Sequence, residues 1–287
     1  MPETKYYDYE NKRPLDLEED GCELQQWESH PEQYRFAKHP KGFLIFLAHD
    51  KLDESDEYSD SDPYSVEETI DGGFHNRRIE LTVELVKEAV LSNQSGVKVL
   101  DLGCGEGHIT EKIRQTLSGS EVTGLDYALS AIEYAHEHFP KVDFAVGDAY
   151  DLPYAEEFFD VVVCNNLWEH VPDPLLLLNG MKKVLKPGGH LIISTPSRYR
   201  IGNLGRILLG KPIKFMSHHH VTEYTVGQVK EQLRYGGFEV RKATSRSISA
   251  ANLKEGIARF FFSKFISLVG SHHQLEETIF YLAQRVK

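Results

Sequence analysis

Apolar and polar positions follow two alternating patterns along the middle of the chain. Short apolar runs typical of buried strands alternate with segments whose apolar residues recur every three or four positions, as on one face of a helix. The runs predict strands at 97–102, 121–126, 142–148, 158–165 and 190–196. The amphipathic segments predict helices at 108–117, 128–138 and 174–185. This alternation indicates an α/β fold with a parallel sheet covered by helices on both faces.

The flanking segments are less regular. Helical spacing predicts a helix over 76–91, with Asn76 as its cap, and a later helix over 226–235. Two further strands are expected at 237–246 and 277–286, which brings the sheet to seven. Residues 1–75 show little periodicity, and FLIFLA at 43–48 fits either a short buried strand or part of a helix. Insertions at about 197–222 and 249–274 interrupt the rhythm of the domain at 76–287.

Composition narrows the class of protein. The 287 residues suit one large domain with additions, and a formal charge of −12 disfavours a nucleic-acid backbone as the main partner. The three cysteines lie far apart without a CxxC pair, so neither a disulfide framework nor a zinc site is indicated. The first residues contain no apolar signal core, and no apolar run is long enough to span a bilayer. We therefore expect reduced thiols and a cytoplasmic location.

The most informative loop is VLDLGCGEGHIT at 99–110. A dinucleotide-binding loop of the G-x-G-x-x-G type requires glycine where His108 stands, and the spacing and lysine of a P-loop are absent. Glycines after Asp101 would let a ligand approach the backbone, and the following helix N-terminus would favour a carboxylate. Asp101 could pair with an ammonium group, so an amino-acid headgroup matches both charges. The alternative is a plain tight turn.

A second acidic residue, Asp126, ends the next predicted strand. Such a carboxylate can accept hydrogen bonds from both ribose hydroxyls, although it can also serve only as a helix cap. An amino-acid pocket and a ribose pocket one β/α unit apart describe a ligand such as S-adenosylmethionine.

At this point the chain resembles the class I S-adenosylmethionine-dependent methyltransferases. VLDLGCGEG resembles their first motif, VTGLDYA the ribose motif, VGDAYDLPYAEEFFDVVVCNN the adenine and fourth-strand motifs, and LKPGGHLIISTP the fifth-strand motif. The resemblance is strong over about 97–197 and looser over 223–245 and 277–286. It implies a Rossmann-like, doubly wound, mostly parallel seven-stranded sheet with an antiparallel last strand, plus an N-terminal extension and two lid insertions.

The resemblance also implies which residues hold the cofactor. Asp148 would meet the adenine amino group with the backbone of Ala149 beside it, while Tyr127 and Leu152 would flank the ring. Asn165, at the end of the fourth strand, would face the methionine portion. The full set of expected cofactor-binding residues is Asp101, Gly103, Cys104, Gly105, Asp126, Tyr127, Asp148, Ala149 and Asn165.

WEHVPDP, KPGG and HHHVTEYT resemble the branch that methylates small molecules, which includes ubiquinone-biosynthesis O-methyltransferases and relatives acting on sugars and antibiotics. Some quinone O-methyltransferases carry E-x-x-E-H after the fourth strand, where the acidic groups and histidine can hold a divalent cation. Here the first glutamate is replaced by Asn166, which removes one hard anionic ligand. We therefore expect no metal.

Methylation of a hydroxyl oxygen requires removal of its proton. Histidine has a suitable pKa for a general base, and His170 and the run His218–His220 are the candidates, although most of the 14 histidines will have ordinary surface or hydrogen-bonding roles. We assign catalysis to His170, His219 and His220. Three consecutive histidines cannot all point at one ion.

The expected substrate regions are the N-terminal extension and the two insertions. KLDESDEYSDSDPYSVEE at 51–68 predicts a solvated acidic loop, and residues 1–75 are a candidate substrate lid. The segments 200–215 and 256–270 are basic and amphipathic within an acidic protein. They predict either lids or a homodimer contact, or else contact with a membrane surface or a lipid-linked substrate.

The leading hypothesis is therefore a methyltransferase that moves a methyl group from S-adenosylmethionine to a hydroxyl of a phenol, sugar or lipid-linked small molecule, leaving S-adenosylhomocysteine. One alternative is a protein or nucleic-acid methyltransferase. The acidic charge disfavours nucleic acid, and CNNLWEH stands where an amino-methylating enzyme carries [DN]PP[YF]. The other alternative is a cofactor-binding module without turnover.

Overall fold

A computed structural model describes residues 5–29, 33–47, 49–52, 72–90, 96–245, 257, 260, 264 and 277–286. Most of the acidic loop predicted at 51–68, and nearly all of the insertion predicted at 249–274, lie outside the described residues. Across the described part of the chain, no helix has the length and apolar character needed to cross a membrane.

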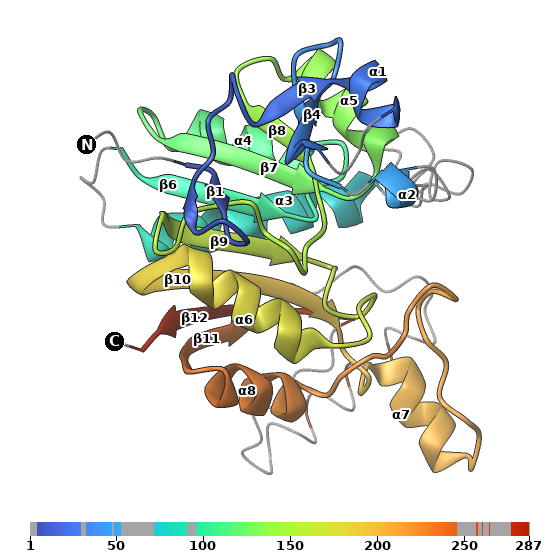
Figure 1. The fold of residues 1–287 in the computed structure, drawn as a ribbon. Helices are drawn as coiled ribbons and strands as arrows, with labels where there is room; N and C mark the ends of the chain where they lie inside the picture. Colours follow the sequence, from blue (N-terminus) through green and yellow to red (C-terminus); the bar gives the residue numbers. More distant parts are fainter. Residues whose placement is uncertain are drawn as a thin grey trace.

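The seven predicted strands form the centre of one sheet (Figure 1). Their spatial order is β11 (Phe238–Thr244), β12 (Thr278–Arg285), β10 (Leu185–Pro196), β9 (Phe159–Asn165), β6 (Lys98–Leu102), β7 (Glu121–Asp126) and β8 (Asp143–Val146). The strands from β10 to β8 are parallel, whereas β12 runs antiparallel to both β10 and β11. The predicted antiparallel last strand is therefore confirmed.

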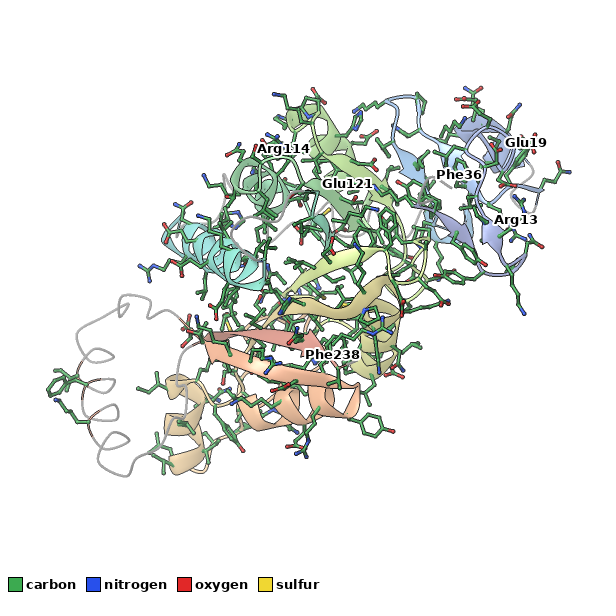
Figure 2. All side chains as sticks on the ribbon, turned by 90° about the vertical axis from the view of Figure 1, so that its left-hand side faces the viewer. Arg13, Glu19, Phe36, Arg114, Glu121 and Phe238 are labelled. Carbon is green, nitrogen blue, oxygen red and sulfur yellow. The ribbon has the colours of Figure 1, made fainter. Side chains whose placement is uncertain are left out.

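All seven strands predicted for the domain at 76–287 are present, but the sheet is larger than predicted, with ten strands among the described residues. Three short strands from the N-terminal extension continue it beyond β8, namely β5 (Leu44–Ile45), β4 (Phe36–Lys38) and β3 (Gly21–Glu23). β5 lies parallel to β8, with Leu44 opposite Ala145 and Ile45 opposite Val146. Strands of two or three residues are too short to give a recognisable period, which is why only FLIFLA suggested one. Figure 2 shows Phe36 of this added edge at the opposite end of the molecule from Phe238 of β11.

Helices cover both faces of the sheet, as the strand–helix alternation predicted (Figure 1). Val161 and Val163 of β9 pack in one core cluster with residues of α3 (Gly72–Ala89) and α4 (His108–Thr116). Their neighbours Val162 and Cys164 point the other way, into the cluster that contains α6 (Pro174–Val184) and α8 (Val226–Tyr235). This two-residue alternation is the packing expected of a strand buried on both faces.

The remaining elements lie around this core. β1 (Tyr7–Asp8) and β2 (Arg13–Pro14) form a separate two-stranded ribbon, and α1 (Leu24–Ser29) and α2 (His49–Leu52) belong to the N-terminal extension. α5 (Leu129–His138) packs on β7 and β8. α7 (Ile201–Leu208) belongs to the first insertion and stands apart from the sheet in Figure 1.

Helix α3 differs from its prediction in a way that matters for the site. It begins at Gly72, four residues before the expected cap Asn76, and so crosses the expected boundary at residue 75. The sequence missed this start because the apolar spacing begins only at Ile79. The extra turn carries His75 into the helix, with Arg78 one turn further on.

Candidate functional site

The glycine loop connects β6 to α4 through backbone conformations that favour glycine. Gly105 and Gly107 have φ values of 51° and 79°, and Gly107 is the N-cap of α4. A Cβ added to Gly105 would meet no atom within 4 Å, so the space beside it is open to a ligand. A Cβ added to Gly107 would lie 2.6 Å from Cζ of Phe144. One glycine therefore leaves room for a ligand, and the other permits close packing of the core.

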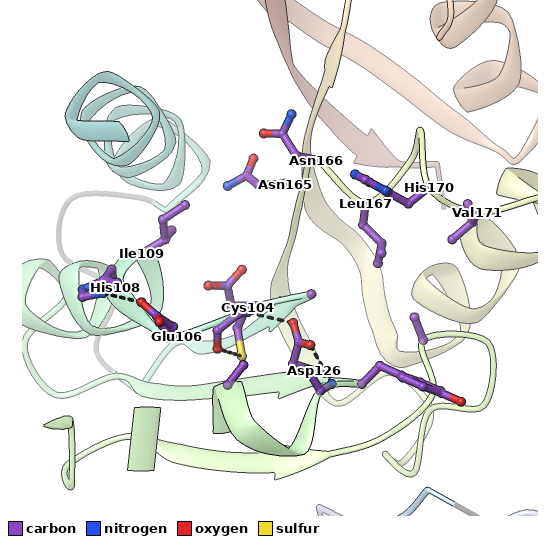
Figure 3. Close-up of a pocket in the computed structure, with 18 of the residues that line it drawn as sticks. Cys104, Glu106, His108, Ile109, Asp126, Asn165, Asn166, Leu167, His170 and Val171 are labelled. Carbon is purple, nitrogen blue, oxygen red and sulfur yellow. Dashed lines mark hydrogen bonds and ion pairs between the residues drawn. The ribbon is translucent and has the colours of Figure 1, made fainter. Parts of the chain in front are cut away.

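A cavity of about 590 Å³ lies at the carboxyl ends of the central strands, beside this loop (Figure 3). Strand ends of a parallel α/β sheet are the usual ligand site of such folds. The cavity is lined by all nine expected cofactor-binding residues and by His170, namely Asp101, Gly103, Cys104, Gly105, Asp126, Tyr127, Asp148, Ala149, Asn165 and His170.

Asp101 is a buried residue of the cavity lining. It is 2% exposed, and the Thr110 hydroxyl donates a hydrogen bond of 2.6 Å to its Oδ2. Burial, with a smaller contribution from the charge of Asp126, raises the pKa of Asp101 to about 6. A buried carboxyl of this kind gains from a positively charged partner, which fits an ammonium group.

Asp126 holds the loop and the following helix together. Its Oδ2 accepts a hydrogen bond of 2.7 Å from the Gly105 amide, and its Oδ1 accepts one of 3.0 Å from the Ala128 amide (Figure 3). The N-cap of α5 is Ala128 and the helix has no side-chain cap hydrogen bond, so Asp126 does not cap it. Its carboxylate joins the glycine loop to the turn before α5 and also lines the cavity.

Two cavity residues on α3 were missed by the sequence analysis. His75 and Arg78 both line the cavity, and Thr82, one turn later, accepts a hydrogen bond of 3.0 Å from Nδ2 of Asn165. Burial, followed by the charge of Arg78, lowers the pKa of His75 to about 4. The spacing of positions 75, 78 and 82 along one helix face was the available signal, but the predicted start at Asn76 concealed it.

The adenine end differs in two details from expectation. Leu152 is not among the described residues that line the cavity, because it is buried in the core, and Tyr150 lines the cavity instead. Lys51 of α2 forms an ion pair of 2.9 Å with Oδ2 of Asp148. The N-terminal extension therefore reaches the cavity at the residue expected to meet adenine, a contact that no motif in the sequence indicated.

The opposite end of the cavity is formed after β9. Asn166 has a φ of 52°, a conformation that asparagine tolerates better than most residues, and its Nδ2 donates a hydrogen bond of 3.0 Å to Oε1 of Glu169. His170 lines the cavity across from Glu106 and His108 in Figure 3. Burial, together with the nearby His220, lowers the pKa of His170 to about 4, against a hydrogen bond with the His219 backbone. His170 is therefore neutral near pH 7 and can accept a proton.

The histidine run lies beside His170, but its members differ in place. The ring of His220 meets the ring of His170 edge to face at 4.9 Å between centroids, and its Nδ1 lies 3.0 Å from Oε1 of Glu223. His218 and His219 contact each other, with centroids 3.8 Å apart, and neither is among the cavity-lining residues described. Successive residues of a loop point in different directions, so His220 meets His170 ring to ring, whereas His219 bonds it through the backbone. A catalytic role for His219 stays a prediction.

Glu223 is the acidic partner that the sequence analysis missed. Its carboxylate is completely buried, and it accepts hydrogen bonds from Arg200 and from the backbone of Met216 in addition to contacting His220. Burial favours its neutral form, but the hydrogen bonds from His220, Arg200 and Met216 outweigh burial and lower the pKa of Glu223. The charged carboxylate fixes the orientation of the His220 ring.

Glu169, His170 and His220 also satisfy the geometry of a cation site. One potential ligand atom of each lies within 4.8 Å of the others, and Oε2 of Glu169 and Nδ1 of His170 are buried without a hydrogen-bond partner among the described residues. His220 thus supplies a donor where Asn166 removed one, and two imidazoles with one carboxylate suit a transition metal better than magnesium. The expectation of no metal stays a prediction.

Comparison with known proteins agrees with this geometry. A family model described as a methyltransferase domain matches residues 93–247, more than half of the chain. The chain belongs to this family and is a class I S-adenosylmethionine-dependent methyltransferase by fold and by the cofactor that the family uses.

The match to a curated relative covers only part of each chain. The chain is 30% identical over 155 residues to a ubiquinone biosynthesis O-methyltransferase from Xanthomonas euvesicatoria, a match that covers 51% of this chain and 64% of the relative. It therefore spans less than two thirds of that relative's length.

Two solved structures share the fold at lower identity. The complex between the Haloferax volcanii Trm112 methyltransferase activator and a candidate methyltransferase matches with a TM-score of 0.57 at 19% identity, covering 82% of this chain and 98% of that chain. The [4+2]-cyclase SpnF matches with a TM-score of 0.53 at 19% identity, covering 72% of this chain and 81% of the other. The same fold therefore carries more than one chemistry.

Proposed function

We propose that the protein transfers the methyl group of S-adenosylmethionine to a hydroxyl oxygen of a small molecule, a phenol, sugar or lipid-linked acceptor. The observation that carries this proposal is a single cavity in which all nine expected cofactor residues share walls with His170, itself in contact with His220. The likeness to ubiquinone-biosynthesis O-methyltransferases supports oxygen as the accepting atom.

Each part of S-adenosylmethionine has a proposed partner among the residues that line the cavity. Asp101 would receive the ammonium group, and Arg78, which lines the same wall and lowers the pKa of Asp101 by its charge, would attract the carboxylate. Asp126 would accept hydrogen bonds from the ribose hydroxyls, and Asp148 with Tyr127 would hold adenine. The sulfonium supplies an electrophilic methyl group, so the chain's own tasks are alignment, exclusion of water and removal of the acceptor proton.

His170 is the proposed general base, with His220 as the second histidine of the pair. His170 would act in the neutral form, and the Glu223 carboxylate, 3.0 Å from Nδ1 of His220, would orient that second ring. A divalent cation held by Glu169, His170 and His220 would instead polarise the acceptor oxygen. The acceptors are small molecules in this proposal because the cavity has a volume of about 590 Å³ and the chain is acidic.

The test is turnover of purified protein with a panel of phenols, sugars and lipids, measured as S-adenosylhomocysteine formed and as the mass of one methylene gained by the acceptor. We expect His170→Gln to reduce turnover by about a hundredfold or more while the dissociation constant of S-adenosylmethionine stays unchanged. His190→Gln, on β10 and outside the cavity lining, is the matched control. The same turnover assay with a chelator distinguishes a metal-dependent reaction from catalysis by a histidine base, because only the metal-dependent reaction would stop.

The cyclase with the same fold motivates the second candidate, a cofactor-binding protein that does not transfer the methyl group. Tight binding of S-adenosylmethionine without any S-adenosylhomocysteine across the whole panel would favour it over methyl transfer. Absence of cofactor binding would contradict both.

A further inference from the structure

The N-terminal extension packs against the loop that forms one end of the cavity. Residues 147–155, which we term the adenine loop, follow β8, and Asp148, Ala149 and Tyr150 of this loop line the cavity. The family model matches residues 93–247, so the extension lies outside the match. The extension nevertheless continues the sheet beyond β8 with β5, β4 and β3 (Figure 1). A segment outside the family match therefore adjoins the expected cofactor site.

The start of the adenine loop is bound by β5 and by the residues after it. β5 and β8 are parallel, so both strands end at the same edge of the sheet. The amide of Phe46 donates a hydrogen bond of 2.8 Å to the carbonyl of Val146, the last residue of β8. Leu47 is buried in the core, and α2, which carries Lys51, follows. The pairing of β5 with β8 thus brings Lys51 to Asp148.

The end of the adenine loop is bound by the first described residues of the extension. The amide of Tyr7 donates a hydrogen bond of 3.0 Å to the carbonyl of Pro153. The hydroxyl of Tyr9 donates a hydrogen bond of 2.6 Å to the carbonyl of Tyr154. The rings of Tyr6 and Tyr154 are both buried and stack with 5.6 Å between their centroids. The extension therefore holds the adenine loop at both ends, and the three cavity residues lie between these ends.

Each carboxylate oxygen of Asp148 has a partner. Its Oδ1 accepts a hydrogen bond of 2.9 Å from the Tyr150 amide, and its Oδ2 lies 2.9 Å from Nζ of Lys51. Partners on both oxygens fix the plane of the carboxylate, and each oxygen keeps a second lone pair for a ligand. A carboxylate fixed in this way can accept a hydrogen bond from the exocyclic amino group of adenine without first being ordered. Hypoxanthine carries a carbonyl oxygen at the same position, which would place two acceptors together.

We infer that the N-terminal extension completes the cofactor site and that Lys51 is a positioning residue, which holds Asp148 in the orientation that selects adenine. This role of Lys51 rests on the proposed assignment of Asp148 to the adenine amino group, but not on the identity of the acceptor or of the general base. The side chains of Lys51 and Asp148 are 46% and 22% exposed, so the ion pair between them has a modest effect on affinity.

The test is calorimetry of the full-length protein with S-adenosylhomocysteine and with S-inosylhomocysteine, in which a carbonyl replaces the amino group of the base. We expect the wild type to prefer the adenine compound, and Lys51→Ala to reduce that preference about three- to fivefold, because the carboxylate can then turn away. Lys51→Arg should restore the preference, since a guanidinium also binds a carboxylate. Lys41→Ala is the matched control, because Lys41 is an exposed lysine of the same extension that forms its ion pair of 3.6 Å with Glu133 of α5.

A further variant, Asp148→Ala, separates the role of Lys51 from the assignment on which it rests, and we expect it to abolish the preference for adenine. An unchanged preference in Asp148→Ala, or no preference in the wild type, would remove the adenine assignment and the role of Lys51 with it. An unchanged preference in Lys51→Ala, together with its loss in Asp148→Ala, would overturn the role of Lys51 alone. Equal weakening of both compounds in Lys51→Ala would show that Lys51 only stabilises the fold, and would also overturn that role.

Discussion

The two ends of the cavity are built in different ways. The cofactor end consists of loops that directly follow consecutive strands, so Asp101, Gly105 and Asp126 lie within one β/α/β unit of the chain. The end proposed for the acceptor is lined by His170, whose ring contacts His220, and His220 in turn lies beside Glu223. His220 and Glu223 are separated from His170 by about fifty residues and by α6, β10 and α7. The first arrangement is local and leaves a motif in the sequence. The second depends on how an insertion folds back onto the domain.

The two ends of the cavity also differ in what shapes them, backbone conformation at one end and buried charge at the other. At the cofactor end, backbone shape makes the site, with left-handed glycines and a carboxylate bound to two amides. At the acceptor end, buried ionisable groups set the chemistry, with a neutral His170 and a charged Glu223. Substitutions should therefore affect affinity and stability at the first end and turnover at the second.

The largest effect at the cofactor end is expected for Asp126→Ala. Loss of a carboxylate that accepts hydrogen bonds should weaken S-adenosylmethionine binding by about a hundredfold or more, measured by calorimetry. Asp151→Ala, exposed on the following loop, is the control. An unchanged affinity in Asp126→Ala would remove the ribose assignment and leave this carboxylate only its bonds to the Gly105 and Ala128 amides.

The two glycines should separate fold from binding. Gly107→Ala places a methyl group 2.6 Å from Phe144 at a φ of 79°, which should lower the free energy of unfolding by about 2–4 kcal/mol in urea titrations. Gly105→Ala faces open space and should cost about 1 kcal/mol while weakening the cofactor more strongly. Equal losses of stability in the two variants would contradict the division of roles.

The smallest effect is the pH dependence of cofactor binding. The pKa of Asp101 is about 6, and its ionised form is the one that pairs with an ammonium group. Affinity should be nearly full at pH 7 and fall about tenfold between pH 7 and pH 5, because a proton must then be released on binding. Calorimetry across this range tests the slope, which Asp101→Asn should abolish. A slope that persists in the Asn variant would assign the proton to another group.

The sequence predicted the local features of this molecule better than the contacts between distant segments. The sequence predicted every central strand because apolar runs alternate with amphipathic helices. For β7 and α8, the predicted first and last residues are those of the structure. Among the edge strands, β5 was left open between strand and helix, and β3 and β4 were missed, because two- or three-residue strands have no period. The early start of α3 was missed because the residues before Ile79 are largely polar. That start concealed His75 and Arg78.

The sequence by itself determined the doubly wound core, because strand periodicity is encoded by neighbouring positions. It also predicted nine cofactor-binding residues, all of which line one cavity. Only the tertiary structure decided which histidine joins His170, since the choice of His220 over His219 depends on a buried Glu223 and Arg200 that the fold brings together. Likewise, only the tertiary structure showed that Lys51, which follows β5 beside β8, reaches Asp148. Contacts between distant segments depend on packing, and packing leaves no periodic pattern along the chain.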